Sequence, residues 1–337
     1  MKKILGLFIF FIFICTKTFG AGIEIEPTML SKPLGENRVW VGTFQLVWND
    51  FIDKFVHTAV RFKNGTPEMV WQLNARDFST SDISDDSYYK YAGRVNKNTK
   101  THIVKAIKNK FNETSDILDK LDLTPDYNKF LIYAMLKKDF EFIKEFDKLG
   151  ESDFGEGQSA KYFGIDRKSG DALDKGVTVL FYNDENDYAV KLLTKDKDEV
   201  YLYKTSANKP FRQLYADMNA KNRAFKGETS FKRIDELKVP ELKFFKEKNF
   251  EELQNKRVLG TNLVIDKAVE TVKFEMNNKG VKLKSEAAMI MMGSAFNPNP
   301  EVPRLFYFDD TFVLFLKETG KKSPYFALRV HDISDFR

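Results

Sequence analysis

Cysteine and histidine are nearly absent from this sequence, and their scarcity excludes several kinds of chemistry. Cys15 is the only cysteine among 337 residues, and it lies in an N-terminal segment that we expect to be removed. The mature chain would then contain no disulfide, no reactive thiol and no thiolate metal site. His57, His102 and His331 are too scattered to indicate a metal-binding set, and no cofactor is expected.

A strong excess of one charge is also missing. The formal charge of +5 falls to about +2 once Lys2, Lys3 and Lys17 leave with the N-terminal segment. Nothing in this balance requires a nucleic-acid partner, and none is predicted. No Ser-His-Asp arrangement is evident either, so the chain is not expected to be an enzyme.

The first 20 residues have the layout of a cleaved secretory signal. Two lysines precede an apolar run from Ile4 to Cys15, and short polar or small residues follow it. The run is too short to span a membrane comfortably, so cleavage before Ala21 is favoured over a membrane or lipid anchor. We therefore expect a secreted protein, extracellular or periplasmic, without membrane contact after cleavage.

The remaining residues, 21–337, are predicted to form a single α+β domain. No internal repeat or low-complexity linker divides them, and the 32 Phe and 13 Tyr of the sequence can build a large core. Apolar residues at helical spacing predict helices over 45–62 and 101–111, with a polar, turn-rich surface connection over 75–100. A third, short helix is expected over 211–219.

Strand patterns dominate the rest of the chain. The runs 176–182 and 187–193 flank the residues N-D-E-N, which predicts a hairpin. Pro240 indicates an edge strand over 239–246, because proline lacks a backbone donor. Further strands are predicted at 129–136, 199–204, 269–276, 305–308, 312–316 and 325–331.

The C-terminal motifs resemble those of the serpin family. Residues 306–316, F-Y-F-D-D-T-F-V-L-F-L, fit the family's C-terminal signature at every position except Asp310. Residues 325–330, Y-F-A-L-R-V, are similar to its closing strand, although Leu328 replaces the usual glycine. The signature is fairly specific on its own.

Segments further upstream strengthen this resemblance. F-E-M-N-N-K-G over 274–280 is similar to the family's hinge, which has E-x-N-x-x-G after an apolar stretch. Residues 130–136 and 145–147 resemble the central strand and its exit, and 239–253 resembles the strand-then-helix unit before the hinge. The resemblance covers about 101–330 and is weak before that, which indicates a shortened helical half.

The resemblance implies both a fold and a mechanism. A serpin-like fold would pack a helical N-terminal part on a large mixed or antiparallel main sheet. A second cluster of β-sheets and an exposed reactive loop at about 280–303 would complete it. In the family, a protease cuts this loop, and the cut loop inserts into the main sheet as a new strand and traps the protease. The implied function is a secreted, monomeric inhibitor of a serine or cysteine protease.

The resemblance also places the bond that the protease would cut. Counting from Gly280, the family's loop length puts the scissile bond between Ser294 and Ala295, or alternatively between Met292 and Gly293. The small residues around the first position suit the shallow pockets of elastase-like or subtilisin-like serine proteases. These proteases are therefore the expected partners.

The first part of the loop decides whether it can insert. Gly280, Val281, Leu283 and Ser285 form the loop hinge in this interpretation, and strand alternation would turn the last three inward. No proline occurs in 281–297, so each residue keeps its ladder donor. Leu283 is bulkier than the small residues usual in the family, so insertion could be slow.

Two further positions depart from the family pattern. Glu270 and Tyr133 are shutter-like positions, where the family has histidine and asparagine respectively. Glu270, Leu283 and the shortened helical half support an alternative, a non-inhibitory serpin-fold protein that acts as a binding or carrier module. Inhibition is the favoured interpretation.

A group of lysines suggests one more partner. Lys97, Lys100, Lys105 and Lys108 could bind a polyanion such as a sulfated polysaccharide, as some serpins do. A solvated helix face is the more ordinary interpretation of such a run.

Overall fold

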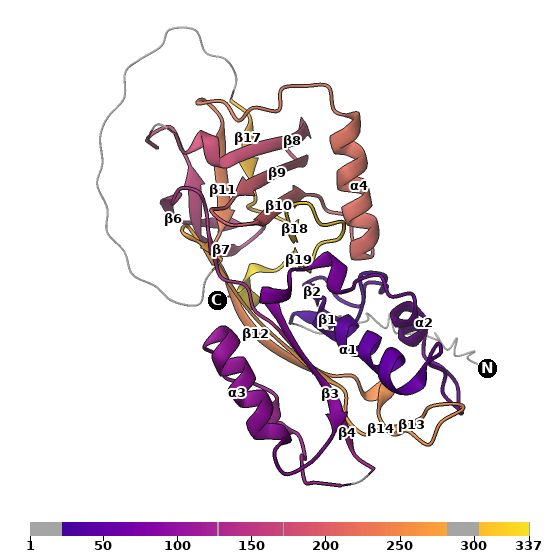
Figure 1. The fold of residues 1–337 in the computed structure, drawn as a ribbon. Coiled ribbons are helices and arrows are strands. Elements are labelled where there is room, and N and C mark those ends of the chain that lie inside the picture. Colours follow the sequence, from indigo (N-terminus) through magenta and orange to yellow (C-terminus); the bar gives the residue numbers. More distant parts are fainter. Residues whose placement is uncertain (1–21, 127, 171, 282–302, 337) are drawn as a thin grey trace, which may run out of the picture.

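The predicted α+β class is confirmed by a computed structural model that contains helices and several β-sheets (Figure 1). It describes residues 22–126, 128–170, 172–281 and 303–336. The predicted secretory signal lies outside these residues, and so does the reactive loop from 282 to 302. No helix within the described ranges is long and apolar enough to cross a membrane.

The largest sheet has seven strands. In spatial order they are β1 (Glu24–Glu26), β2 (Arg38–Val41), β19 (Phe326–Val330), β18 (Phe312–Glu318), β10 (Asp198–Lys204), β9 (Asp187–Leu193) and β8 (Val177–Asp184). Neighbours are antiparallel except for β1 and β2, and β8 with β9 confirms the predicted hairpin. Helix α4 (Phe211–Ala224) packs on this sheet through contacts of Phe211 and Tyr215 with Phe315. All residues of β18, which lies inside this sheet, are buried.

A second sheet corrects one prediction. Its order is β17 (Leu305–Tyr307), β11 (Glu236–Pro240), β7 (Gln158–Ile165) and β6 (Asp147–Phe154). The single edge strand predicted over 239–246 is wrong, because β11 ends at Pro240 and a different strand begins at Leu242. β11 lies inside its sheet, and Pro240 is tolerated because β17 pairs only with residues 236–238.

The third sheet and a separate strand pair lie lower in Figure 1. The sheet order is β12 (Leu242–Asn249), β15 (Val269–Asn277), β16 (Gly280–Val281) and β5 (Phe140–Glu141). The pair, which we call the β3–β4 ribbon, consists of β3 (Tyr88–Arg94) and β4 (Phe130–Leu136). A short hairpin joins β13 (Lys256–Arg257) to β14 (Val264–Ile265). The surface connection predicted over 75–100 is thus partly wrong, since it contains β3.

The first helix is shorter than the sequence suggested. Helix α1 (Thr43–Phe51) continues as a π-turn over Ile52–Val56 and ends at His57, which has a left-handed φ of 61°. The predicted helix over 45–62 is therefore too long, because the His57 N–H bonds to Ile52 and the left-handed residue turns the chain away. The other helices are α2 (Glu68–Asn74) and α3 (Thr99–Phe111), and the latter confirms a prediction. Short 3₁₀ turns occur at Thr80–Asp82, Asp85–Ser87, Leu118–Lys120, Asp174–Gly176, Glu251–Leu253 and Ile333–Phe336.

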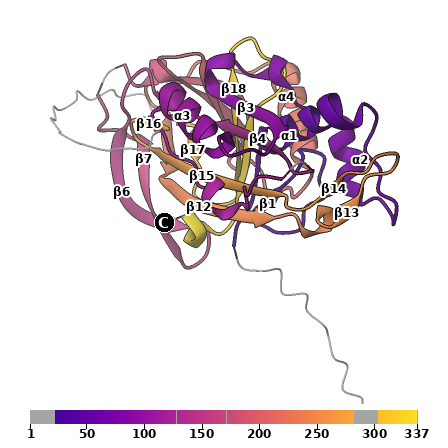
Figure 2. The same ribbon diagram turned by 60° about the horizontal axis from the view of Figure 1, so that its bottom comes forward.

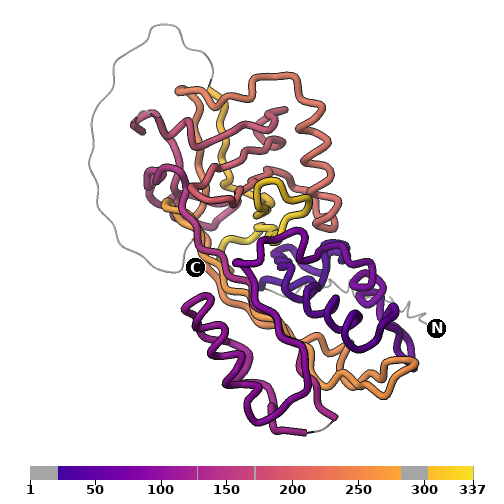
Figure 3. The backbone as a smooth tube through the Cα atoms, in the orientation of Figure 1, coloured from indigo at the N-terminus to yellow at the C-terminus, as the bar shows by residue number. Residues whose placement is uncertain are grey.

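The β3–β4 ribbon has a hydrophobic cluster of its own, apart from the main core. This cluster joins the ribbon to α3 and to the turn after it, through Val95, Ile103, Ile107, Leu118, Leu131 and Tyr133. Figures 2 and 3 show the ribbon between α3 on one side and α1 on the other. The ribbon and α3 therefore form a small unit that borders the rest of the molecule.

A buried ion network ties this unit to the seven-stranded sheet. The Lys138 ammonium, just after β4, lies 2.9 Å from Asp198 Oδ1 and 2.5 Å from Glu318 Oε1. Tyr325 donates to Asp198, and the backbone N–H of Ser84 donates to Glu318 at 3.0 Å. Both carboxylates are at least 95% buried, so Lys138 is their counter-ion in a region of low dielectric constant.

We predict that Lys138→Met will destabilise the protein by about 3–5 kcal/mol, because two buried carboxylates lose their counter-ion. Lys100→Met removes an exposed ion pair with Asp119 and is the matched control, with an expected cost below about 1 kcal/mol. Urea unfolding followed by tryptophan fluorescence measures both. Equal unfolding free energies for the two variants would contradict a structural role for the network.

Candidate functional site

Two strand edges face each other, and the structure describes no full strand between them. Within the described residues, β4 pairs only with β3, and β15 pairs with β12 along its length and with β16 only at its C-terminal end. β5 and β15 both run antiparallel to β16, so they are parallel to each other. β4 leads into β5 through residues 137–139. The two edges therefore resemble neighbours in a sheet from which the intervening strand is missing.

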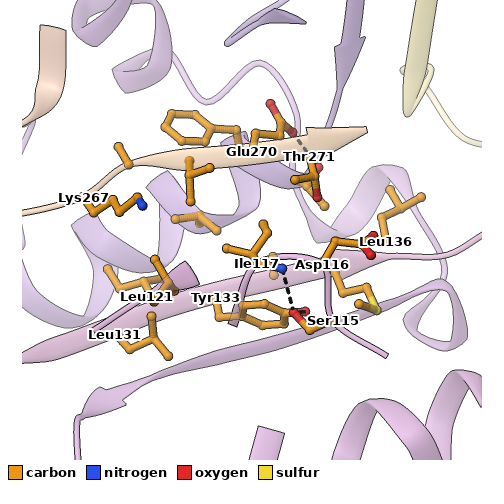
Figure 4. A pocket seen from close by; sticks show the side chains of 18 of the residues that line it. Ser115, Asp116, Ile117, Leu121, Leu131, Tyr133, Leu136, Lys267, Glu270 and Thr271 are labelled. Carbon is orange, nitrogen blue, oxygen red and sulfur yellow. Dashed lines mark hydrogen bonds between the residues drawn. The ribbon is translucent and has the colours of Figure 1, made fainter. Parts of the chain in front are cut away.

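The space between them, which we call the β4–β15 cleft, is a cavity of about 1380 Å³. Helix α1 forms its floor, and the segment 112–123 after α3 lines its other face. In the close-up, Tyr133 and Ser115 lie on one side of the cleft and Glu270 lies on the strand at the opposite side (Figure 4). The lining combines apolar residues such as Phe44 and Ile132 with lysines and carboxylates such as Lys267 and Asp116.

One end of the cleft is closed by a tight turn over 277–280, the hinge turn. The carbonyl oxygens of Asn278 and Lys279 accept hydrogen bonds from the backbone N–H groups of Phe146 and Phe142, each at 2.9 Å. Gly280 has a φ of 152°, and a Cβ there would lie 2.3 Å from the carbonyl oxygen of Phe140. Glycine is required at this position because the two backbones approach so closely.

The hinge turn directs the chain into the cleft. β16 pairs with β15 through Met276 and Val281 and with β5 through Val281 and Phe140. It runs antiparallel to both and therefore starts back along β15 from the closed end. Gly280 and Val281 thus occupy the first two positions of a strand between β15 and β5.

Glu270 is a buried acid on the α1 side of the cleft. Its side chain is 4% exposed, and its Oε1 accepts a hydrogen bond from the Thr43 hydroxyl at 2.7 Å. Burial raises the pKa of Glu270 to about 8, while Thr43, the Phe44 backbone N–H and Lys248 favour the ionised form less strongly. Its Oε2 has no hydrogen-bond partner among the described residues. The carboxyl is therefore mostly protonated at neutral pH.

Tyr133, the other shutter-like position, faces away from Glu270. It belongs to the cluster under α3, and its hydroxyl lies 3.3 Å from Ser115 Oγ. Burial raises the pKa of Tyr133, so the ring stays neutral. Glu270 contacts α1 on the other face of the sheet. The structure thus brings both residues to the cleft but does not bring them into contact.

The other predicted residues have mixed outcomes. Leu283 and Ser285 of the loop hinge lie outside the described residues, as do both proposed scissile bonds. The lysines of 97–110 lie on or beside α3, where Lys100 pairs with Asp119 and Lys110 with Asp85. Lys97, Lys105 and Lys108 are exposed. Within the described ranges, no group of three or more histidine, cysteine or acidic side chains could hold a metal ion.

Sequence reasoning missed the floor of the cleft. Thr43 and Phe44 at the start of α1 receive the Glu270 carboxyl, yet they lie where the sequence matched no family motif. The sequence predicted this helix from residue 45, and the structure begins it at Thr43. Because carboxylates favour helix N-termini, the predicted helix start was the available signal for an acidic partner. The partner of that helix start lies far along the chain.

Comparisons with known proteins show similarity at the level of structure. No protein-family model matches the chain, and no curated protein matches it. Serpin48 of the insect Tenebrio molitor is 13% identical over 87% of this chain and 74% of its own, with a TM-score of 0.43. Human kallistatin (13% identity, 70% of this chain, TM-score 0.44) and thyroxine-binding globulin in complex with thyroxine (11%, 69%, 0.44) are also similar.

Serpin48 is named as a serpin, the family that the motifs over 274–280, 306–316 and 325–330 resemble. The three TM-scores are below 0.5, so the similarity extends at most to the fold. The chain spans 64% of the length of kallistatin and of thyroxine-binding globulin. What those proteins bind or inhibit is therefore not transferred to this chain.

We predict that Glu270→Gln will remove part of the pH dependence of stability. The folded pKa of about 8 lies above the unfolded value of 4.5, so the folded state binds the extra proton and loses stability as pH rises between these values. The difference in unfolding free energy between the variant and the parent should shift in favour of the variant by roughly 2–4 kcal/mol when the pH is raised from about 5 to about 8.5. Urea unfolding at both pH values measures this shift.

Glu275→Gln on the same strand is the control, because Glu275 is only partly buried and pairs with Lys243. Glu26, whose pKa burial raises to about 7, changes the pH profile of all three proteins alike. If the unfolding free energy of the parent and of Glu270→Gln changed with pH in the same way, the pKa of Glu270 would not be raised and the residue would be ionised in the folded state.

Gly280→Ala tests the hinge turn. The added methyl would collide with the Phe140 carbonyl, so we expect β16 to separate from β5 at a cost of roughly 1–3 kcal/mol. Hydrogen exchange at the N–H groups of Phe142 and Phe146 should become faster, since they bond to the hinge turn. Gly170→Ala has open space and should leave these rates unchanged. Unchanged exchange in Gly280→Ala would mean that the turn does not depend on this glycine.

Proposed function

We propose that this chain is a secreted serpin-like protease inhibitor whose reactive loop, once cut, inserts as a strand into the β4–β15 cleft. The observation that supports this most is the pair of unpartnered parallel edges, with β16 leading from the closed end between them. An inserted strand would be antiparallel to both edges and would satisfy their backbone groups. Each net hydrogen bond contributes about 1 kcal/mol, and burial of inward side chains adds to it.

The register of β16 gives the proposal a definite geometry. Met276 pairs with Val281, and both are buried. Continuing this register would place Leu283 opposite Phe274 and Ser285 opposite Val272. Ala287 would then lie opposite Glu270, where a small side chain would fit above the floor of the cleft.

The proposed cut lies between Ser294 and Ala295, with Met292–Gly293 as the alternative. Small residues there suit an elastase-like or subtilisin-like serine protease, which is the proposed partner of a monomer. A polyanion is the second proposed partner, and it is supported by the exposure of Lys97, Lys100, Lys105 and Lys108 on and beside α3.

A second function is favoured by a specific observation. The β4–β15 cleft is large, and Glu270, one of its lining residues, has a buried oxygen without a hydrogen-bond partner among the described residues. A non-inhibitory protein of the same fold could use this space to bind a small molecule. The bulk of Leu283 supports this alternative, because a bulky side chain would slow insertion, and a loop that inserts slowly would be cut as a substrate.

The two functions are separated by incubating the chain from Ala21 onward with pancreatic elastase and with subtilisin. We expect an SDS-stable complex with one of them and a cut between residues 292 and 295. The cleaved protein should also melt at a higher temperature, because the inserted strand adds hydrogen bonds and buried surface. Cleavage without a complex and without a rise in melting temperature would exclude inhibition.

Two loop variants make this experiment sharper. Ser285→Arg would place a charge on the inward face of the inserting strand, which is costly to bury. It should convert the inhibitor into a substrate. Glu286→Arg changes the neighbouring outward position and should still form the complex. Equal behaviour of the two variants would contradict insertion in the proposed register.

A further inference from the structure

The α1 side of the β4–β15 cleft combines apolar walls with one buried acid. Phe44, Val47 and Phe51 line it from α1, and Ile132 lines it from β4. The other acids of the lining are partly or fully exposed, so Glu270 is the single buried acid among its described residues. The cavity exceeds the roughly 300–1,000 Å³ of typical small-molecule sites.

Among the described residues, no positive side chain forms an ion pair with Glu270. Lys248 is its partner across the β12–β15 ladder, but the Lys248 ammonium is bound by Glu24 of β1. Helix α1 contributes the Thr43 hydroxyl and the Phe44 backbone, which are uncharged. Across the cleft, β4 presents apolar side chains that pack on the main core. Within the described chain, Glu270 therefore forms no ion pair and its Oε2 lacks a partner.

We propose that the β4–β15 cleft binds a lipophilic primary amine, with the ammonium at Oε2 of Glu270 and the hydrocarbon along α1 and β4. An ammonium supplies both the charge and the donors that this oxygen lacks. The start of α1 holds the other oxygen and stabilises the ionised carboxylate. The apolar walls accommodate the hydrocarbon.

Other ligand classes fit this chemistry less well. A carboxylic acid would bring a second acid against Glu270, and a polyol would leave hydroxyl groups without partners beside Phe44, Val47 and Ile132. A purely apolar molecule would fill the space but leave Oε2 unsatisfied. The amine satisfies both the polar atom and the apolar surface.

Amine binding should release a proton. The Glu270 carboxyl is mostly protonated at neutral pH in the unliganded cleft, because burial raises its pKa to about 8. An alkylammonium brings its own proton, and the complex of carboxylate and ammonium holds one proton fewer than the separate partners. Most of one proton therefore passes to the buffer at about pH 7.

The test uses octylamine as the probe and 1-octanol as its neutral analogue, by titration calorimetry on the uncut protein at about pH 7. Measurements in phosphate and in Tris give the number of protons released. We expect saturable binding of one octylamine with release of most of a proton, and weaker binding of octanol without proton release. Absence of octylamine binding would overturn the site.

Variants locate the binding. Glu270→Gln should weaken octylamine binding roughly ten- to a hundredfold and abolish the proton release, while octanol binding stays unchanged. Glu275→Gln, on the same strand, should leave both ligands unaffected. Binding of octylamine that is unsaturable, or that Glu270→Gln leaves unchanged, would mean adsorption to surface carboxylates and would also overturn the proposal.

A third variant covers the case in which Glu270→Gln fails to fold. Val47→Phe narrows the apolar floor without altering the acid and should weaken both octylamine and octanol. If neither ligand is affected, the amine does not lie along α1. These measurements need no protease and no cut loop, so their result is independent of whether the chain inhibits a protease.

Discussion

The edges of β4 and β15, which have no partner between them in the part of the chain that the structure describes, are the constraint on which the rest of this structure depends. Backbone N–H and C=O groups need partners, and an exposed strand edge is a template for another strand. Here two such edges face each other, and β16 already occupies the first positions between them. The hinge turn, the floor formed by α1 and the proposed insertion of the loop all follow from this one vacant position in the sheet.

The vacant position is bordered on one side by the β3–β4 ribbon, which packs on both of its faces. One face packs under α3 in a hydrophobic cluster of its own, and Ile132, Ala134 and Leu136 of β4 pack on the main core. The Lys138 network ties the end of β4 to Asp198 and Glu318 of the large sheet. The two edges are joined by the hinge turn at one end only.

Glu270 shows how a single buried acid links stability with binding. Its protonated form is favoured by burial, and the start of α1 satisfies only one of its oxygens. An inserted strand would pass over this residue with alanine beside it, whereas a lipophilic amine would pair with it directly. Both proposals therefore use the same space, and Glu270 is the residue at which strand insertion and ligand binding can be distinguished.

The sequence by itself determined the elements whose pattern is local. The strand pattern in 269–276 and the helical spacing in 101–111 predicted β15 and α3, because these depend on neighbouring residues. β3 was missed because its residues are half-buried and its partner β4 lies beyond α3 in the chain. The cleft, too, could not be predicted, since the contact of Glu270 with Thr43 joins distant segments. Which strand edges stay unpaired is therefore decided only by the tertiary structure, because it depends on where remote segments come to lie.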